Sequence, residues 1–547
     1  MTASHKFRWL FAILMIGLMI STVSSEARQP EKPVSPHTSL VFPGDDGRLK
    51  YSPDEFGNSV PDFSHAGYMG GGVRIPDVPV KATVKPGGDN DSGRIQAAID
   101  KVSNMPADKN GFRGAVLIKR GRYTLDEPIR ITTGGVILRG EGQDANGSVL
   151  FGRGVIKDLP WREKTNGANL VFIEGTGSRE EDEPTSRKIT DEFVPVGAVS
   201  FAVASISGYS VGDAIVVRSL TTREWFEDLD LDYDAWGDNV TTYSLERTIT
   251  AIEKNRVTID VPLTCPIESK WGGGEIVKYT EPGRIRKSGV ENLRGESDFD
   301  RKVRRSEYGN MDRQPYIGAE YFSDEDHYFN FIRFDNLCDG WVRNVTAVHF
   351  ARSCVYLAGG VKRVTVQDCE SIEPVSVCAG GRRFTFLVNG QLCLVQRCTS
   401  DKGRHSFVLG GRMTPGPNVF LHCTATVPFS SSEPHSQLVV GSLYDNVKAP
   451  LALRYALSKP ARWMGIYNYL WNCEGMYLVQ KPPHAQNYAF GHVGIHAVIF
   501  NKGLIEPSYP NGHIESWNEP VEPKSLYLKQ LEDRLGKQAL DNIGWSR

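Results

Sequence analysis

Several features that would place a chain in a special class are missing from this sequence. Its 547 residues contain no Gly-X-Y repeat and no low-complexity tract, so collagen-like and disordered chains are excluded. The 63 Lys and Arg nearly balance the 65 Asp and Glu, and the formal net charge of −2 predicts no general attraction to nucleic acid or to a membrane surface. None of the nine cysteines forms a CxxC pair, which argues against a zinc site. Beyond the N-terminal region no run of about 18 apolar residues occurs, so we expect no membrane anchor.

The N-terminal residues predict export. Lys6 and Arg8 precede an apolar run from Trp9 to Ile20, and residues 21–27 are small and polar, which is the pattern of a secretory signal peptide. The apolar run is too short to span a bilayer. Removal of residues 1–25 takes away two positive charges and changes the formal net charge from −2 to −4. We therefore expect a secreted or periplasmic protein.

The cysteines recur in a repeated frame. The blocks 364–369, 393–398, 418–423 and 468–473 each end in a cysteine, and these cysteines follow one another after 29, 25 and 50 residues. Gly-Gly pairs close short strand-like runs in the same region. Repeats of this length made of short strands and turns indicate a solenoid, because one turn cannot bury its own apolar face. We expect an inward column of reduced, buried thiols at about 4.8 Å spacing, formed by Cys369, Cys398, Cys423 and Cys473.

Both ends of the repeat region carry helical patterns, and its middle is interrupted. Ile95, Ile99 and Val102 share one face of a helix that begins near Asp91, which would cover the open end of a coil. Leu528, Leu531 and Leu535 predict a second capping helix near the C-terminus. Residues 191–283 break the repeat spacing and contain strands of their own, so we expect a compact β-rich insertion beside the solenoid.

Four stretches resemble a known group of proteins. The helix at 93–102 and the stretches 116–125, 135–142 and 284–297 are similar to the pectate-lyase-like superfamily of right-handed parallel β-helices. The resemblance covers residues 86–190 and 284–515. Members include lyases and hydrolases of acidic polysaccharides, but also non-catalytic tail-spike and adhesin domains, so the fold does not decide the function.

The repeat pattern and the resemblance together predict an all-β chain. Its fold is a right-handed parallel β-helix with an inserted β-rich domain and capping helices at both ends. The expected parts are a signal peptide (1–25), an N-terminal extension (26–85), the first rungs with their capping helix (86–190), the insertion (191–283), the main β-helix (284–515) and a C-terminal capping helix (516–547).

A local excess of positive charge marks the candidate site. The stretch 382–412 has a net charge of +5 in a chain that is negative overall, which suits an anionic ligand. Within it, residues 404–409 align with 434–439, so His405 and His435 would begin strands on adjacent rungs, one above the other. Two imidazoles beside guanidinium groups can transfer protons near neutral pH. The alternative is that both histidines are turn residues that bond backbone carbonyls.

These residues suit β-elimination on a uronate-containing polysaccharide. Arg404 would neutralise the carboxylate, His405 would remove the proton, and His435 would act as acid or orienting partner. Lys402 or Tyr444 are substitutes for either proton-transfer role. The expected substrate-binding residues are Arg382, Arg383, Lys402, Arg412, Tyr444 and His327.

Two other functions stay open. A glycoside hydrolase would need two carboxylates about 5–10 Å apart, for which Asp401 and Glu433 are the candidates. A non-catalytic glycan-binding solenoid needs neither. In each case the expected partner is an acidic polysaccharide, and the sequence indicates no oligomeric state.

No set of metal ligands is predicted, although Ca²⁺ is the metal that the alternating aspartates of the insertion would bind. Counted from Asp230, the EF-hand pattern fails, because Ala235 replaces the turn glycine and Thr241 replaces the closing glutamate. A polar stripe precedes the cysteine column and is expected to face solvent; it consists of His349, Asp368, Arg397, His422 and Asn472.

Overall fold

The computed structural model describes residues 37–154, 160–236, 243–306, 320–435, 437–456, 462–497 and 509–545. The expected signal peptide lies outside these residues. Within them, no helix has both the length and the apolar character needed to cross a membrane.

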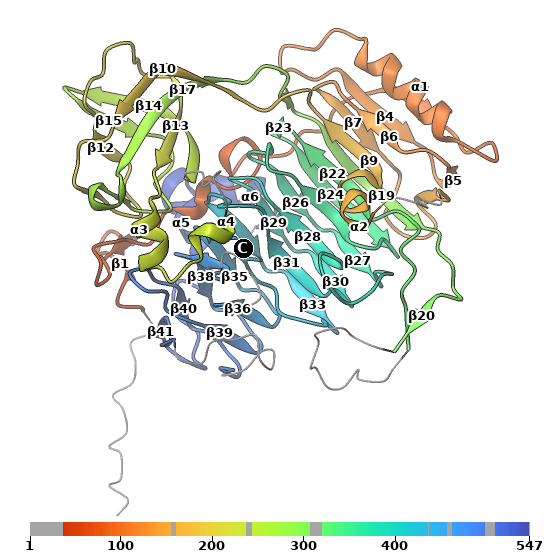
Figure 1. The fold of residues 1–547 in the computed structure, drawn as a ribbon. Coiled ribbons are helices and arrows are strands. Elements are labelled where there is room, and N and C mark those ends of the chain that lie inside the picture. The colour runs from red at the N-terminus through yellow and green to blue at the C-terminus, as the bar shows by residue number, and fades with distance from the viewer. Residues whose placement is uncertain are drawn as a thin grey trace, which may run out of the picture. The chain divides into compact units, whose positions relative to one another are not determined.

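Parallel strands of successive turns stack in register and form the solenoid (Figure 1). In the first sheet, each strand pairs with the equivalent strand of the next turn. Its strands are β3 (Val80–Val84), β4 (Gly114–Ile118), β7 (Val136–Arg139), β19 (Gly289–Ser297), β24 (Trp341–Val348), β26 (Thr365–Gln367), β29 (Leu394–Gln396), β32 (Asn418–Leu421), β35 (Ser442–Asp445), β38 (Tyr469–Trp471), β40 (Tyr488–Phe490) and β41 (His513–Glu515).

Two further sheets complete the turn. The second sheet continues from the ends of β19 and β24 and contains β5 (Gly121–Leu125), β8 (Ser148–Gly152), β27 (Glu370–Ile372), β30 (Thr399–Asp401) and β33 (Thr424–Thr426). The third sheet contains β6 (Ile129–Ile131), β9 (Asn169–Glu174), β22 (Asn330–Asp335), β25 (Ser353–Leu357), β28 (Phe384–Val388) and β31 (His405–Leu409). The predicted right-handed parallel β-helix is confirmed.

Shorter elements lie between or outside these sheets. Three parallel pairs are β18 (Ile285–Arg286) with β23 (Leu337–Cys338), β34 (Val439–Val440) with β37 (Gly465–Ile466), and β36 (Leu451–Leu453) with β39 (Tyr477–Val479). Two antiparallel pairs are β1 (Val41–Pro43) with β2 (Leu49–Tyr51), and β20 (Arg304–Arg305) with β21 (Tyr321–Phe322). Helix α2 (Trp161–Gly167) and the 3₁₀ turns η1 (Phe63–His65) and η2 (Tyr68–Gly70) lie outside the sheets.

The cysteine column is confirmed, and the strand register explains it. Gln367, Gln396 and Leu421 pair across β26, β29 and β32, so the cysteines two residues further on are aligned. The next position in the column is Val447, which is why Cys473 follows only after two turns. The four thiols are buried and free, at Cys369, Cys398, Cys423 and Cys473.

The residue before each column position turns the corner between the first and second sheets. Its φ is positive at Asp368 (55°), Arg397 (51°), His422 (47°) and Asn472 (46°), the left-handed region that lets the chain turn sharply. The predicted polar stripe is therefore a row of corner residues. His349 does not belong to it, because the register of β24 puts Asn344 at this corner.

The N-terminal end of the solenoid is covered by helix α1 (Ser92–Ser103). Ile95, Ile99 and Val102 are fully buried in the same cluster as Val84 and Val116 of the first turns. The helix thereby covers strand edges that would otherwise be open to further pairing. The parallel stack already begins at β3, a few residues before the predicted start at residue 86.

The C-terminal helices do not cap the opposite end. Helices α5 (Leu526–Leu535) and α6 (Lys537–Asn542) lie along the side of the solenoid across several turns. Asp445 Oδ2 accepts hydrogen bonds from Ser525 Oγ (2.7 Å) and from the backbone N–H of Tyr527 (2.8 Å), and Gln396 Nε2 donates to the carbonyl of Ile543 (3.2 Å). The predicted second cap is wrong in its position, because the apolar face of α5 packs against the N-terminal extension and the flank of the rungs.

The interruption of the repeats is an antiparallel module that stands apart from the parallel stack (Figure 1). Its six strands, in sheet order, are β10 (Glu180–Lys188), β17 (Gly274–Thr280), β13 (Ala214–Ser219), β14 (Tyr243–Glu253), β15 (Arg256–Ile259) and β12 (Ser200–Ala202). A second pair is β11 (Phe193–Val194) with β16 (Ile267–Glu268), and the helical segments are α3 (Arg223–Asp228), α4 (Tyr233–Trp236) and η3 (Ser269–Trp271). Because β10 pairs with β17, the module begins before the predicted residue 191.

A buried ion cluster joins this module to the solenoid. The carboxylate of Glu246 accepts from both terminal nitrogens of Arg284 (2.7 and 2.9 Å), and Lys362 Nζ lies 3.3 Å away. Glu246 is 1% exposed. Burial alone would raise the pKa of its carboxyl group, but Arg284 and Lys362 outweigh it and hold the pKa below its ordinary value.

We predict that Glu246→Gln destabilises the protein by about 3–5 kcal/mol, because it removes the carboxylate that pairs with the buried Lys362 and leaves Arg284 with Glu281 alone. Denaturant unfolding followed by circular dichroism measures the change. The matched control is Glu183→Gln, an exposed partner of Arg218, which should cost about 1 kcal/mol or less. Equal effects of the two substitutions would contradict the prediction.

Candidate active site

The two predicted histidines lie side by side, although the sequence alignment that suggested this is wrong in register. His405 begins β31 as expected and pairs with Phe384 of β28. Pro434, however, bridges to Leu409 rather than to Arg404, and the next strand begins at Val439. The segment before Pro434 still returns to the start of β31, and the centroids of the two imidazole rings are 4.4 Å apart.

A buried carboxylate connects the two rings. Glu433 Oε1 accepts from His435 Nδ1 (2.8 Å) and lies 3.6 Å from His405 Nδ1. Arg454 donates from Nε to Oε2 (3.0 Å) and from Nη2 to Oε1 (3.2 Å), and Ser431 Oγ donates to Oε2 (2.8 Å). We call Glu433, His405, His435 and Arg454 the histidine cluster.

Burial differs between the two imidazoles. His405 is 1% exposed, and its Nδ1 bonds to the carbonyl of Ser431 (2.5 Å), while its Nε2 is buried with no hydrogen-bond partner among the described residues. The side chain of His435 is 7% exposed. Phe384 packs edge-on against both rings. His435 is therefore the imidazole nearer to solvent, and its orientation is fixed by Glu433.

The electrostatics of the cluster fix its protonation states. Burial would raise the pKa of Glu433, but Arg454 and the two histidines outweigh it, so the pKa lies well below its ordinary value and the group stays ionised. Burial, the charge of Arg404 and the neighbouring His435 lower the pKa of His405 well below its ordinary value. His405 is therefore neutral at pH 7.

Arg404 brings a positive charge to this cluster. Its guanidinium lies over the Phe384 ring, 5.9 Å from the centroid, and Nη1 donates to the carbonyl of Gly380. Among the described residues it makes no ion pair, and its Nε has no hydrogen-bond partner. Burial lowers its pKa to about 10, so it is still a cation at neutral pH.

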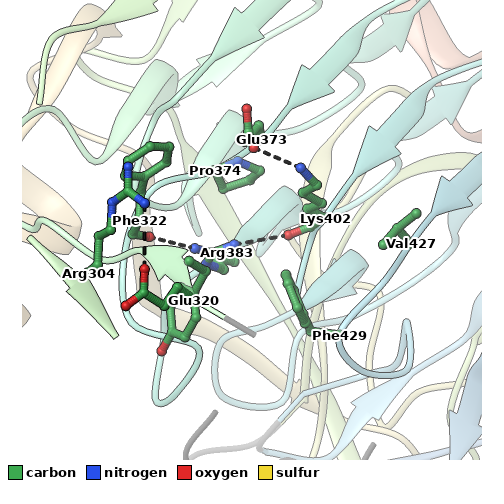
Figure 2. A pocket seen from close by; sticks show the side chains of 10 residues that line it. Arg304, Glu320, Phe322, Glu373, Pro374, Arg383, Lys402, Val427 and Phe429 are labelled. Atoms are coloured by element: carbon green, nitrogen blue, oxygen red, sulfur yellow. Dashed lines mark hydrogen bonds and ion pairs between the residues drawn. The ribbon is translucent and has the colours of Figure 1, made fainter. Parts of the chain in front are cut away.

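A pocket opens at the neighbouring corner between the second and third sheets (Figure 2). Its volume is about 210 Å³, and Arg304, Arg383 and Lys402 line it together with Glu320 and Glu373. Lys402 Nζ bonds to Glu373 Oε1 (2.7 Å). Arg383 is 2% exposed and donates to backbone carbonyls, including that of Ser376 (2.9 Å). Its guanidinium therefore holds the backbone of the corner in place and is not available to a ligand.

The remaining predicted substrate-binding residues lie elsewhere. Arg382 forms a bidentate ion pair with Glu325 (both 2.9 Å), and Arg412 is exposed. Tyr444 is wrongly predicted, since it is fully buried in the solenoid core and its hydroxyl donates to the carbonyl of Phe407. His327 is also wrongly predicted, since it is 1% exposed and bonds to Ser297 Oγ (2.8 Å) and to the carbonyl of Val375 (2.9 Å).

The aspartates considered for Ca²⁺ do not converge. Asp228 contacts His484, Asp230 bonds to Arg462 and Tyr509, and Asp234 bonds to Arg223. Within the described parts of the chain, the one group with metal-ligand spacing is His405, Glu433 and His435, whose ligand atoms lie within 4.8 Å of one another. Arg454 already occupies both oxygens of Glu433, so a guanidinium provides the positive charge there.

Sequence reasoning missed Arg454 and Phe384 as members of the site. Arg454 follows β36 one turn after Glu433, and Ser432 bridges to Leu451. An alignment of 432–435 with 451–454 would have placed Arg454 level with His435, two residues from the carboxylate of Glu433. Phe384 follows directly after the Arg382-Arg383 pair, but nothing in its local sequence marks it.

We predict that stability falls as the pH drops from 7 to 5, and that His405 contributes to the fall. Because its pKa is lowered in the folded state, the unfolded chain binds the proton first once the pH drops through about 6.5, the unfolded value. His405→Gln should therefore reduce the difference in unfolding free energy between pH 7 and pH 5. Denaturant titration at the two pH values measures it.

The matched control for this prediction is His484→Gln, because the side chain of His484 is 61% exposed. His405→Gln should reduce the pH dependence of stability more than His484→Gln does, because His405 is buried and His484 is largely exposed. An unchanged dependence in His405→Gln would show that His405 titrates as it does in the unfolded chain.

Comparison with known proteins gives similarity of fold alone. No family model and no curated protein matches the sequence. Similar solved structures include the tailspike gp49 of Pseudomonas phage LKA1 (13% identity, TM-score 0.43, covering 74% of this chain and 57% of that chain) and the tailspike gp61 of Pseudomonas phage phi297 (14%, 0.42, 79% and 61%). A hyperthermoactive exopolygalacturonase from Thermotoga maritima is 12% identical, with a TM-score of 0.31, and 80% of this chain and 96% of that chain are covered.

This chain spans less than two thirds of the length of either tailspike. At these identities the similarity says nothing of chemistry. By its own strand pairing the chain is a parallel β-helix, the architecture that its resemblance to the pectate-lyase-like superfamily implied.

Proposed function

We propose that the protein is an exported lyase that cleaves an acidic, uronate-containing polysaccharide by β-elimination. The observation that carries the proposal is the histidine cluster beside Arg404. This guanidinium has no carboxylate partner among the described residues, and a uronate carboxylate supplies the missing charge. The imidazoles next to it can accept the proton whose acidity that contact increases.

The exposure of the two rings supports a different division of roles between His405 and His435. His435 has the more exposed ring of the two. The hydrogen bond between its Nδ1 and Glu433 directs its Nε2 away from the carboxylate. We assign His435 as the base and His405 as the neutral imidazole that packs beside it. The base takes the proton from C5, the C–H electron pair forms the C4–C5 double bond, the C4–O bond breaks, and the departing oxygen takes a proton from water.

The protonation state of Glu433 favours elimination over hydrolysis. A hydrolase needs a carboxylic acid that keeps its proton near neutral pH. The pKa of Glu433 is held well below its ordinary value, and Lys402 outweighs burial to lower that of Glu373. Among the described residues, the carboxyl group whose pKa burial raises to about 6 is that of Asp445, which is covered by α5.

We predict that His435→Ala lowers turnover by about 10²–10⁴-fold on whichever uronate polysaccharide is cleaved. Arg404→Ala should also lower turnover, and Arg404→Lys should restore part of it, because a point charge cannot make the bidentate contact. The assay follows the ultraviolet absorbance of the unsaturated product and the product size on alginate, polygalacturonate and related polymers.

His513→Ala and Arg153→Ala are the matched controls, because they remove an imidazole on β41 and an exposed guanidinium paired with Asp126. Full activity in His435→Ala would exclude the site. Shorter products without ultraviolet absorbance would favour the hydrolase, and tight binding without shorter products would favour the glycan-binding solenoid.

A further inference from the structure

A second cleft lies where three distant parts of the chain meet. The N-terminal extension contributes Phe56 and Asn58, the inserted module contributes Phe193 and Glu268, and the solenoid contributes Tyr467. The cleft has a volume of about 410 Å³, which is the size of a small-ligand site. None of its lining residues belongs to the histidine cluster.

The extension is fixed to the module at this point. Asn58 Oδ1 accepts from the backbone N–H of Val196 (2.9 Å), and the N–H of Ser59 donates to the carbonyl of Val196 (3.0 Å). On the other side, β11 pairs with β16 and places Phe193 opposite Glu268. The walls of the cleft are therefore held by backbone pairing and are formed before any ligand arrives.

One wall presents aromatic surface. Phe193 is 39% exposed, although it lies on a strand, and its ring packs against Gly57, where an added Cβ would approach within 3.3 Å. Phe56 is half-buried, and Tyr467 is 3% exposed and forms the floor. An exposed aromatic ring at the mouth of a cleft is a surface on which a sugar ring can stack.

The same cleft contains an unsatisfied polar group. Asn58 is 2% exposed, and its Nδ2 makes no well-formed hydrogen bond among the described residues, although its amide interacts with the Tyr467 hydroxyl. A buried donor without an acceptor costs about 1–3 kcal/mol. A hydroxyl oxygen of a ligand in the cleft would remove this cost.

The charges at the cleft select against anions. Glu192 and Glu268 both line it, and Lys270 neutralises one of them through its 2.9 Å contact with Glu268. The remaining negative charge repels a uronate carboxylate, whereas carboxylate oxygens accept hydrogen bonds from sugar hydroxyls.

We propose that this cleft binds an uncharged sugar residue, by stacking on Phe193 and by hydrogen bonds to Asn58 and the two glutamates. It is a binding site separate from the proposed catalytic one. Its ligand differs in charge from the uronate that the histidine cluster would act on.

Calorimetric titration of the full chain with uncharged cello-, manno- and galacto-oligosaccharides, and with tetragalacturonate, tests the proposal. We expect at least one uncharged oligosaccharide to bind, and Phe193→Ala to weaken it by about tenfold. Glu192→Gln should raise the affinity of this cleft for tetragalacturonate. The control is Val211→Ala, an exposed apolar residue of the same module.

Titrations in the His435→Ala background separate this site from the proposed lyase. If none of the uncharged oligosaccharides binds, the proposal is overturned. It is also overturned if tetragalacturonate binds more tightly than they do and that binding is lost in Phe193→Ala. Absence of lyase activity in the unsubstituted protein, with sugar binding intact, would refute only the catalytic assignment.

Discussion

Every feature of the solenoid depends on the in-register stacking of one turn on the next. Parallel pairing fixes each residue above its equivalent, so a corner at Asp368 requires a corner at Arg397 and another at His422. Non-glycine residues accept positive φ at these corners because the ladders on both sides hold the backbone. The same stacking aligns the buried thiols, which fill the space inside each corner.

Stacking also explains how a charged cluster persists in a nearly dry environment. The start of β31 lies above the start of β28, which packs Phe384 against His405, and the following turn brings Glu433 over the same place. Each charge there meets an opposite one, since Arg454 bonds both oxygens of Glu433. Arg404 is the exception, since it makes no ion pair among the described residues, and the proposed function depends on this cation beside two imidazoles.

The inserted module uses a different principle. It has its own antiparallel sheet, yet it shares a hydrophobic cluster with late turns, where Leu245 and Phe226 pack in the same core as Leu443. Glu246 adds a buried ionic contact with Arg284 and Lys362. These contacts hold the module close enough to the solenoid to form the second cleft, which Phe193 and Tyr467 line.

The sequence by itself determined the solenoid, the cysteine column, the helix over its N-terminal end and the presence of an insertion. All of these follow from periodicity, because a repeat states which residues are equivalent. The tertiary structure decided what periodicity does not encode. It placed Tyr444 in the interior, because this residue stacks in register between the buried Phe420 and Leu470, and it placed His327 there through the fold of the loop before β22. It also laid α5 along the flank, where apolar surface was available. It also set Pro434 beside Leu409 and brought Arg454 to Glu433, because an irregular loop between two strands fixes its own register through contacts that no local sequence specifies.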